Sequence, residues 1–432
     1  MSAPNPTSPA VSPPAPSLPK ESNPSTANAT HHLAPSQRLV SLDVLRGFDM
    51  FWILGADALC YALARTWKVP PFTWLAEQLD HAEWAGFHFY DLIFPLFVFI
   101  VGVSVVYSLT RLVEREGRAA AVKRVLRRGA LLLALGIFYN GGITNPWPDI
   151  RLLGVLPRLA IVYTATGLLF CFLKPRALAA TTVALLGGYW ALMAFVPIRD
   201  VAMERNAVPA RLGVAKPTME QARKLFDGTT TMVTGKFEPG LNLSNHLDFE
   251  YLGGRKYDVY WDPEGLLSTL PAVASCLLGV FAGLLMRRTD LDERKKLSRL
   301  LIAGAVALAL GWLWHLQFPV IKKIWTSSFV LVAGGWSLLL LGGFYYAVDI
   351  RRWRGWCQPF VWIGMNPITL YVISGILGYR RMALRLSAGD VKLWFDAHLT
   401  TGFGDVVISL TALALMFALA RFLYRREIFL RF

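Results

Sequence analysis

A histidine and an aspartate lie close together where a short polar stretch meets a long apolar one. His81 opens the block His-Ala-Glu-Trp-Ala-Gly, and Asp91 follows ten residues later, just before Leu-Ile-Phe-Pro. Histidine is the side chain best suited to accept a proton near neutral pH, and a neighbouring carboxylate can fix its tautomer and stabilise the imidazolium. The pair is therefore suited to deprotonate an amine or hydroxyl during acyl transfer. On spacing alone, a solvated loop histidine is the simpler interpretation.

Further ionisable and polar residues fall at or inside apolar stretches, where charge is costly. Asp43 and Arg46 are three residues apart, so they share a helix face and can form an ion pair. Asp57 has no basic residue in its own turn, and we expect it to face a cavity or a partner. Three more such residues each follow or precede a proline: Arg158, Glu264 and Asn366. For Glu264 a place in the first turn of a helix is an equally good structural explanation.

The composition places these residues in a membrane protein. Hydrophobic residues make up 54% of the 432 residues and charged ones only 17%. Because one helical span needs about 20 apolar residues, the sequence predicts an all-α, polytopic transmembrane helical bundle of about ten spans. The expected spans are 39–64, 90–112, 127–141, 153–173, 177–197, 263–286, 299–318, 326–349, 360–378 and 404–423.

The basic residues indicate how the bundle is oriented. Loops and flanks on one side carry 22 Lys and Arg, and the short loops on the other side carry nine. By the positive-inside rule the richer side is cytoplasmic. Both termini are then predicted to be cytoplasmic, with the His81 loop and the long segment 198–262 facing outward. Because the net charge of +15 lies in such loops, we expect a lipid bilayer and no nucleic acid as partner.

Two segments lie outside the predicted spans. Residues 1–37 are rich in Pro, Ser, Ala and Asn, which predicts a disordered tail ahead of a membrane domain at 38–432. Segment 198–262 is a long outer loop whose aromatic residues could stack on sugars or anchor at the membrane interface, and the sequence favours neither. No residues have metal-ligand spacing, so no metal is expected.

Five short motifs appear in order along the chain: Ser41–Gly47, His81–Gly86 with Asp91–Pro95, Gly154–Leu159, Asp262–Leu267, and Trp325–Ser328. Together they resemble the heparan-α-glucosaminide N-acetyltransferase family and its bacterial relatives, over roughly 39–425. The resemblance implies a fold of the transmembrane acyltransferase type. Acetyl-CoA in the cytoplasm would donate an acetyl group to the amine of a glucosamine-type sugar on the periplasmic or lumenal side. It also implies a homodimer and, for the bacterial branch, the inner membrane and amino-sugar utilisation.

The resemblance also carries residue roles. The essential histidine of the family falls on His81 and the following acid on Asp91. The family's polar residue on the first helix, an asparagine in the animal enzyme, falls on Asp57. We expect four residues to contact the acceptor: Asp57, Trp84, Glu264 and Asn366. We expect five to hold CoA: Arg46, Arg158, Trp325, Thr326 and Ser327, with the arginine fork suited to phosphate.

Two mechanisms and two functions remain open. His81 could act as the base in direct transfer, or it could carry the acetyl group first in a ping-pong mechanism. The chain could instead be an amino-sugar or oligosaccharide transporter with the same fold, since broken helices also suit transporters. The His–Asp pair is expected at one end of the helical bundle and not at the bilayer midplane, which favours an enzyme over a transporter.

Overall fold

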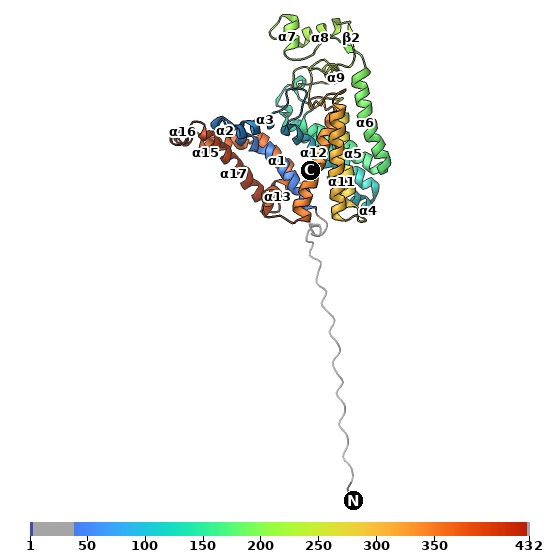
Figure 1. Cartoon of the computed structure of the whole chain (residues 1–432), viewed down its shortest axis with the longest axis vertical. Helices are drawn as coiled ribbons and strands as arrows, with labels where there is room; N and C mark the ends of the chain where they lie inside the picture. The colour runs from blue at the N-terminus through green and yellow to red at the C-terminus, as the bar shows by residue number, and fades with distance from the viewer. Residues whose placement is uncertain (3–38, 430–432) are drawn as a thin grey trace. The chain divides into compact units, whose positions relative to one another are not determined.

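The computed structural model describes residues 1–2 and 39–429. The chain divides after Arg38 into two units, and the helices belong to the unit Leu39–Phe432. The predicted disordered tail at 1–37 lies outside the described residues apart from its first two. Within the described part the only sheet has two strands, β1 (Ile198–Arg199) and β2 (Met232–Val233), paired antiparallel. The prediction of an all-α, polytopic helical bundle is confirmed (Figure 1).

In the described residues, eight helical stretches are long and apolar enough to cross a membrane. The first is α1 (Val40–Phe51), continued through a π turn (Trp52–Ala56) into α2 (Asp57–Thr66). The others are α4 (Phe89–Tyr139), α5 (Val155–Phe172), α6 (Pro175–Phe195), α10 (Thr269–Arg287), α11 (Glu293–Trp314), α12 (Ser327–Phe344) with a π-helical end (Tyr345–Ile350), and α17 (Phe403–Arg425). A broken pair, α13 (Gln358–Met365) and α14 (Pro367–Ile376), is bent by 77° and forms one more candidate.

The long helix α4 is two spans. It has 51 residues, which at about 1.5 Å per residue is far longer than a hydrocarbon core of about 30 Å. Gly117 interrupts it with φ 83° and ψ 172°, a backbone conformation that glycine adopts without a steric penalty. The predicted loop at 113–126 is therefore wrong, because this stretch is helical except at Gly117.

Helix packing shows that the halves of α4 run in opposite directions. Helices α5 and α10 begin side by side, where Arg158 donates a hydrogen bond to Ser268. Helix α10 runs parallel to the first half of α4, with Gly279 against Phe99 and Gly283 against Val103. Helix α5 runs antiparallel to the second half, with contacts Gly136–Pro157 and Gly129–Thr164. Counting both halves, and the broken pair once, gives the ten spans that the sequence predicted.

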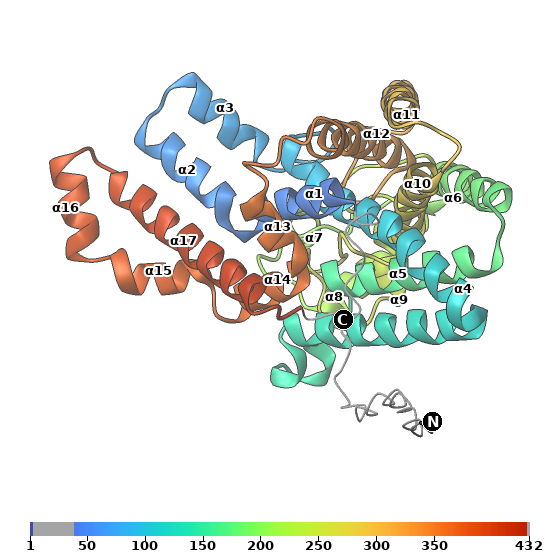
Figure 2. The same cartoon turned by 90° about the horizontal axis from the view of Figure 1, so that it is seen from below.

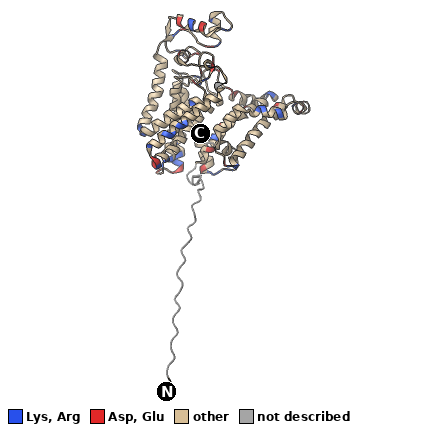
Figure 3. Cartoon of the chain, turned by 180° about the vertical axis from the view of Figure 1, so that it is seen from behind, with Lys and Arg blue, Asp and Glu red and all other residues tan. Residues whose placement is uncertain are grey.

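The helices form two groups with a shared middle (Figure 2). Helices α1, α13 and α14 form the shared middle. On one side of it lie α4, α5, α6, α10, α11 and α12, and on the other side lie α2 and α17. Three short helices complete the second group: α3 (Pro70–Gln78), α15 (Tyr379–Ser387) and α16 (Asp390–His398). Blue Lys and Arg segments are frequent at the helix ends away from α7 and α8 (Figure 3).

The predicted outer loop 198–262 is folded. It contains α7 (Ala207–Leu212), α8 (Met219–Gly228) and α9 (Leu243–Tyr251). Most of its aromatic side chains pack in buried clusters, among them Phe226, Phe249, Tyr260 and Trp261. Tyr251 and Tyr257 are 68% and 65% exposed. They are the aromatic side chains of this described segment that remain exposed enough to meet a sugar or the membrane interface.

Close helix contacts in the middle depend on glycine. A Cβ added to Gly47 of α1 would lie 1.8 Å from the carbonyl oxygen of Phe360 in α13. A Cβ on Gly364 would lie 1.9 Å from the carbonyl oxygen of Asp43. Small residues allow membrane helices to approach backbone to backbone in this way.

We expect Gly47→Ala to destabilise the protein by about 1–3 kcal/mol, because the added methyl group must push α1 and α13 apart. Gly343→Ala in α12 is the matched control, since nothing lies within 4 Å of its added Cβ. Thermal unfolding in detergent measures both. Equal melting temperatures for the two variants would contradict this account of the contact.

Candidate functional site

His81 and Asp91 form a hydrogen-bonded pair at the start of α4. His81 Nδ1 lies 2.8 Å from Asp91 Oδ1, and the other carboxylate oxygen accepts from the backbone N–H groups of His88 (3.0 Å) and Ala82 (3.2 Å). The Asp91 side chain is 1% exposed, whereas that of His81 is 48% exposed. Since an ionised carboxylate only accepts, we assign the ring proton to Nδ1. Nε2 is then the basic atom of an accessible ring.

A lysine that the sequence reasoning did not select completes this cluster. Lys322 Nζ lies 3.1 Å from His81 Nδ1 and 3.5 Å from Asp91 Oδ1. It comes from the loop between α11 and α12, which pairs with the His81 loop through a backbone bond from Gly86 N–H to the carbonyl of Val320 (2.9 Å). The only sequence signal was the pair Lys322-Lys323 ahead of the Trp-Thr-Ser-Ser motif.

Asp57 lies one side chain away from His81. The Tyr90 hydroxyl donates to Asp57 Oδ2 at 3.2 Å, and the Tyr90 ring lies 5.1 Å from the His81 ring. Asp57 begins α2 directly after the π turn, where Gly55 has φ 131°. The break between α1 and α2 thus positions Asp57, and the structure brings this predicted acceptor residue toward the pair.

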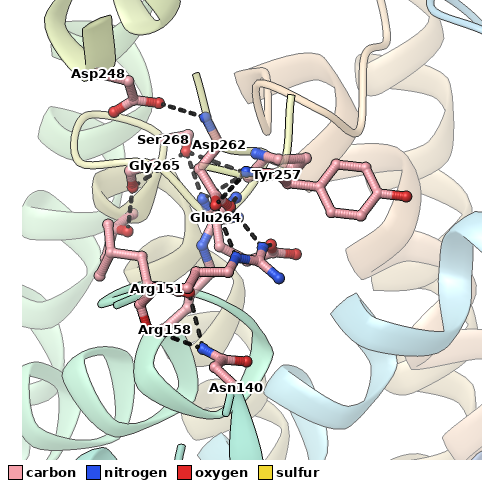
Figure 4. A network of polar contacts seen from close by, with 12 residues as sticks. Asn140, Arg151, Arg158, Asp248, Tyr257, Asp262, Glu264, Gly265 and Ser268 are labelled. Atoms are coloured by element: carbon pink, nitrogen blue, oxygen red, sulfur yellow. Dashed lines mark hydrogen bonds and ion pairs between the residues drawn. The ribbon is translucent and has the colours of Figure 1, made fainter. Parts of the chain in front are cut away.

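A charged network lies at the same end of the bundle (Figure 4). Arg151 Nε and Nη2 bind the two oxygens of Asp262 at 2.9 and 2.8 Å, and Nη2 also lies 3.0 Å from Glu264 Oε2. Burial acts to raise the pKa of Asp262, but the Arg151 guanidinium outweighs it and the pKa is lowered. Burial raises the pKa of Glu264. Arg151 was not singled out from sequence, because nothing there indicates its partner 111 residues away.

Glu264 is not in the first turn of a helix, as the sequence had suggested. Helix α10 begins at Thr269, and residues 262–268 form turns ahead of it. Glu264 is positioned by Arg151 instead of by the positive end of a helix. Because the Glu264 carboxylate also acts on the ammonium of Lys322 electrostatically, the network and the His81 cluster are neighbours.

Arg158 lies in this network and not with the other predicted CoA-binding arginine. Its Nη2 donates to the Pro263 carbonyl (2.8 Å) and to Ser268 Oγ, and its guanidinium lies 4.9 Å from the centre of the Trp325 ring. Its Nε and Nη1 are buried without a hydrogen-bond partner in the described part of the chain. Arg46, by contrast, contacts Ser104 and the carbonyl of Gly364. Ser104 lies about 20 Å along α4 from Asp91.

The remaining predicted CoA-binding residues have structural contacts. Trp325 Nε1 donates to Ser275 Oγ at 3.0 Å, and Ser327 Oγ donates to the carbonyl of Leu186 at 2.7 Å. Thr326 caps α12 and donates to the carbonyl of Pro319 at 2.8 Å. All three are fully buried. Arg158 and Trp325 are in contact, whereas Arg46 lies at the level of Ser104, so the five residues are spread along the bundle and their role in holding CoA stays a prediction.

Two predicted acceptor residues also lie apart from His81 Nε2. Trp84 Nε1 donates to the carbonyl of Phe237 at 2.7 Å and its ring packs on Trp261, so it joins the His81 loop to segment 198–262. Asn366 Nδ2 donates to the carbonyl of Ile428 at 3.0 Å, beyond the end of α17. Because α17 begins beside α2, near the His81 end, Asn366 lies toward the opposite end. At the break before Pro367 the Asn366 side chain contacts the C-terminal segment, and its role in binding the acceptor stays a prediction.

Asp248 in α9 binds the backbone of the segment that carries Asp262 and Glu264. Its carboxylate accepts from the backbone N–H groups of Leu266 (2.8 Å) and Asp262 (3.4 Å). Burial raises the pKa of Asp248 to about 7. Two carboxylates in one network thus differ: the Asp262 pKa is lowered and the Asp248 pKa is raised.

This raised pKa predicts a pH-dependent stability. The folded state holds a proton on Asp248 that an unfolded carboxyl, with a pKa of about 3.9, has lost, so its contribution to stability falls as pH rises from about 4 to about 7. Asparagine does not titrate, so we expect the stability of Asp248→Asn to lack this fall with pH. The melting temperature of the variant, relative to that of the wild type, should therefore rise from about pH 4 to about pH 7. The total effect is on the order of 4 kcal/mol at most. A constant difference between the two proteins from pH 4 to 8 would contradict the prediction.

The fold and the site define a class: a polytopic membrane protein with a histidine–carboxylate pair at one end of its bundle. The family model described as "Heparan-alpha-glucosaminide N-acetyltransferase, catalytic" matches residues 38–208, which include this pair. The heparan-α-glucosaminide N-acetyltransferase of Homo sapiens is 26% identical over 91% of this chain and 59% of its own length. That of Mus musculus is 26% identical over 79% of this chain and 54% of its own length.

The chain is thus similar to heparan-α-glucosaminide N-acetyltransferases over most of its length, and the catalytic family model matches its first half up to residue 208. The resemblance that the five ordered motifs indicated is thus confirmed. The chain spans somewhat more than half the length of the curated relatives it matches.

Proposed function

We propose that this protein is an acetyl-CoA-dependent transmembrane N-acetyltransferase that acts on the amine of a glucosamine-type sugar. The observation that carries the proposal is the His81–Asp91 pair. Its carboxylate is buried, its imidazole is accessible, and both residues lie in the region matched by the catalytic family model. The names of the relatives give the reaction class and the glucosamine acceptor.

In the proposed direct transfer, His81 Nε2 takes a proton from the sugar ammonium or from the attacking amine. The amine nitrogen forms a bond to the thioester carbonyl carbon, the carbon–sulfur bond breaks, and CoA leaves as a thiolate that takes up a proton. Asp91 holds Nδ1–H and stabilises the imidazolium formed in this step. Asp57, reached through Tyr90, and Glu264 are the acceptor-binding candidates that lie nearest to His81.

The alternative mechanism uses the same ring as a nucleophile. His81 Nε2 attacks the thioester carbonyl carbon, the carbon–sulfur bond breaks, and CoA leaves as a thiolate that takes up a proton. In a second step the amine attacks the acetyl-imidazole, the bond from the carbonyl carbon to Nε2 breaks, and the amine proton passes to the released ring or to water. The exposure of His81 suits either route. Incubation with labelled acetyl-CoA alone, followed by acid trapping and peptide mapping, separates them: label on His81 supports the two-step route, and its absence during active turnover supports direct transfer.

The proposal includes an orientation. The donor side is the cytoplasm, where the basic loops lie under the positive-inside rule, with both termini on that side. The His81 end then faces the periplasm or a lumen, in bacteria across the inner membrane. The homodimer that the resemblance implies remains part of the proposal. Because the predicted CoA residues are spread between the His81 end and the level of Arg46, we name none of them as the nucleotide site.

The function is tested with purified protein in detergent, [acetyl-¹⁴C]acetyl-CoA and a panel of glucosamine, chitin-derived and heparan-derived amines. The expected result is label transferred to the amine of at least one amino sugar, with release of one free thiol for each acetyl group. Binding of an amino sugar with no binding or turnover of acetyl-CoA would contradict the proposal and favour the transporter.

A further inference from the structure

Lys322 lies beside both members of the His81–Asp91 pair. Its Nζ is 3.1 Å from His81 Nδ1, 3.4 Å from Nε2 and 3.5 Å from Asp91 Oδ1. Its side chain is 20% exposed, so the ammonium is held close to the ring and is not free in solvent. Backbone pairing between Ala85 and Ile321 fixes the loop that carries it.

The distances from Lys322 Nζ to the two ring nitrogens of His81 are nearly equal, so the ammonium lies beside the ring. The Nδ1 proton is directed to Asp91, and the Nε2 lone pair points to the other side of the ring. An ammonium almost equally far from both nitrogens cannot lie in line with both. Lys322 therefore acts on His81 mainly through its charge, which disfavours the imidazolium, while Asp91 favours it. The Tyr90 ring of α4 packs beside the His81 ring and its hydroxyl donates to Asp57. Asp80 in the same loop accepts from the His81 backbone N–H, and the Glu264 carboxylate acts on Lys322.

Lys322 also balances charge at Asp91. Burial lowers the pKa of Lys322, whereas the carboxylates of Asp91 and Glu264 act to raise it. The neighbouring Lys323 points elsewhere: its Nζ donates to the carbonyl of Glu83 at 2.7 Å and lies 5.8 Å from the centre of the Trp84 ring. Adjacent lysines in one loop thus have different surroundings, and only Lys322 contacts the pair.

We propose that Lys322 is a positioning residue whose ammonium opposes protonation of the adjacent His81 ring while it holds the Asp91 carboxylate in place. This role rests on the proposed function, because a neutral ring is the form that serves as base or nucleophile. The carboxylate alone would do the opposite, since it stabilises the imidazolium. The Lys322 ammonium opposes that effect without removing the hydrogen bond that fixes the tautomer of the ring.

The test follows the ionisation of His81 directly, without the need for turnover. Diethyl pyrocarbonate acylates neutral imidazole, so the rate of His81 modification against pH, read by mass spectrometry of the His81 peptide, gives the midpoint of ring ionisation. We expect Lys322→Met and Lys322→Gln to move this midpoint upward by about one pH unit. Lys322→Arg should stay near the wild type, because it restores the charge. Lys323→Met is the matched control and should move the midpoint much less.

The acidic limb of the acetyl-transfer rate should shift in the same direction as the labelling midpoint. An unchanged midpoint in both neutral variants, with folding confirmed by their melting temperatures, would overturn the role of Lys322. A shifted midpoint in a protein that never transfers acetyl groups would support the electrostatic role and reject the proposed function. The two failures are therefore distinguishable.

Discussion

Replacement of His81 with glutamine is expected to lower the rate of acetyl transfer by about 10²- to 10⁴-fold, the usual contribution of a general base, and by more if the ring carries the acetyl group. Glutamine fills a similar volume and can still donate to Asp91, so the loop should keep its fold. The transfer of label from acetyl-CoA to an amino sugar, at saturating concentrations of both, measures the effect.

His88→Gln is the matched control. His88 lies seven residues later in the same loop, and its ring Nδ1 is 3.2 Å from the carbonyl of Asp80 instead of a carboxylate. Its contact with Asp91 is made by the backbone, which the substitution leaves in place. Turnover near the wild-type level should remain in His88→Gln. Retained turnover in His81→Gln would reject both proposed mechanisms.

Replacement of Arg151 with methionine is expected to destabilise the fold by about 3–5 kcal/mol, the usual cost of breaking a buried ion pair from one side. Asp262 is 1% exposed and would lose both of its Arg151 bonds, and the carboxylate of Glu264 would lose its ion pair with Arg151. Melting temperature or denaturant unfolding in detergent reports the loss. A double variant, Arg151→Met with Asp262→Asn, should recover part of it, because the buried charge is then gone.

Arg205→Met provides the comparison, because Arg205 also pairs with an aspartate of segment 198–262. Arg205 pairs with Asp258 at 3.1 Å, but its side chain is 47% exposed, so we expect a cost of at most about 1 kcal/mol. Equal losses in Arg151→Met and Arg205→Met would contradict the structural role of the Arg151 network.

The sequence predicted the class of fold because apolar span length is a local property. Composition alone required a helical bundle, and the ten predicted spans correspond to the observed helices. The predictions were wrong where one local sequence pattern is compatible with two structures. Basic residues at 113–126 indicated a loop, yet helix α4 continues through them and turns only at Gly117. Pro263 indicated a helix start, yet α10 begins at Thr269, because Asp262 and Glu264 are held by Arg151.

The site was predictable where its members are close in sequence. His81 and Asp91 are separated by one short loop, and the start of a helix brings them together. Lys322 is 241 residues from His81, and the two meet only through the packing of the His81 loop on the loop between α11 and α12. Arg158, Trp325 and Thr326 were assigned to CoA with the family resemblance, the arginine fork being suited to phosphate. Their burial and backbone contacts show that polar groups in a bundle also serve to satisfy each other.

The central claim is that acetyl groups cross from one side of the membrane to an acceptor on the other at His81. Sealed proteoliposomes of known protein orientation test it, with [acetyl-¹⁴C]acetyl-CoA on the side of the basic loops and a tritiated amino sugar on the side of His81. The account predicts doubly labelled N-acetyl sugar on the His81 side and free CoA on the donor side, both lost in His81→Gln. Unmodified sugar crossing the membrane, or acetylated sugar formed only on the donor side, would contradict it.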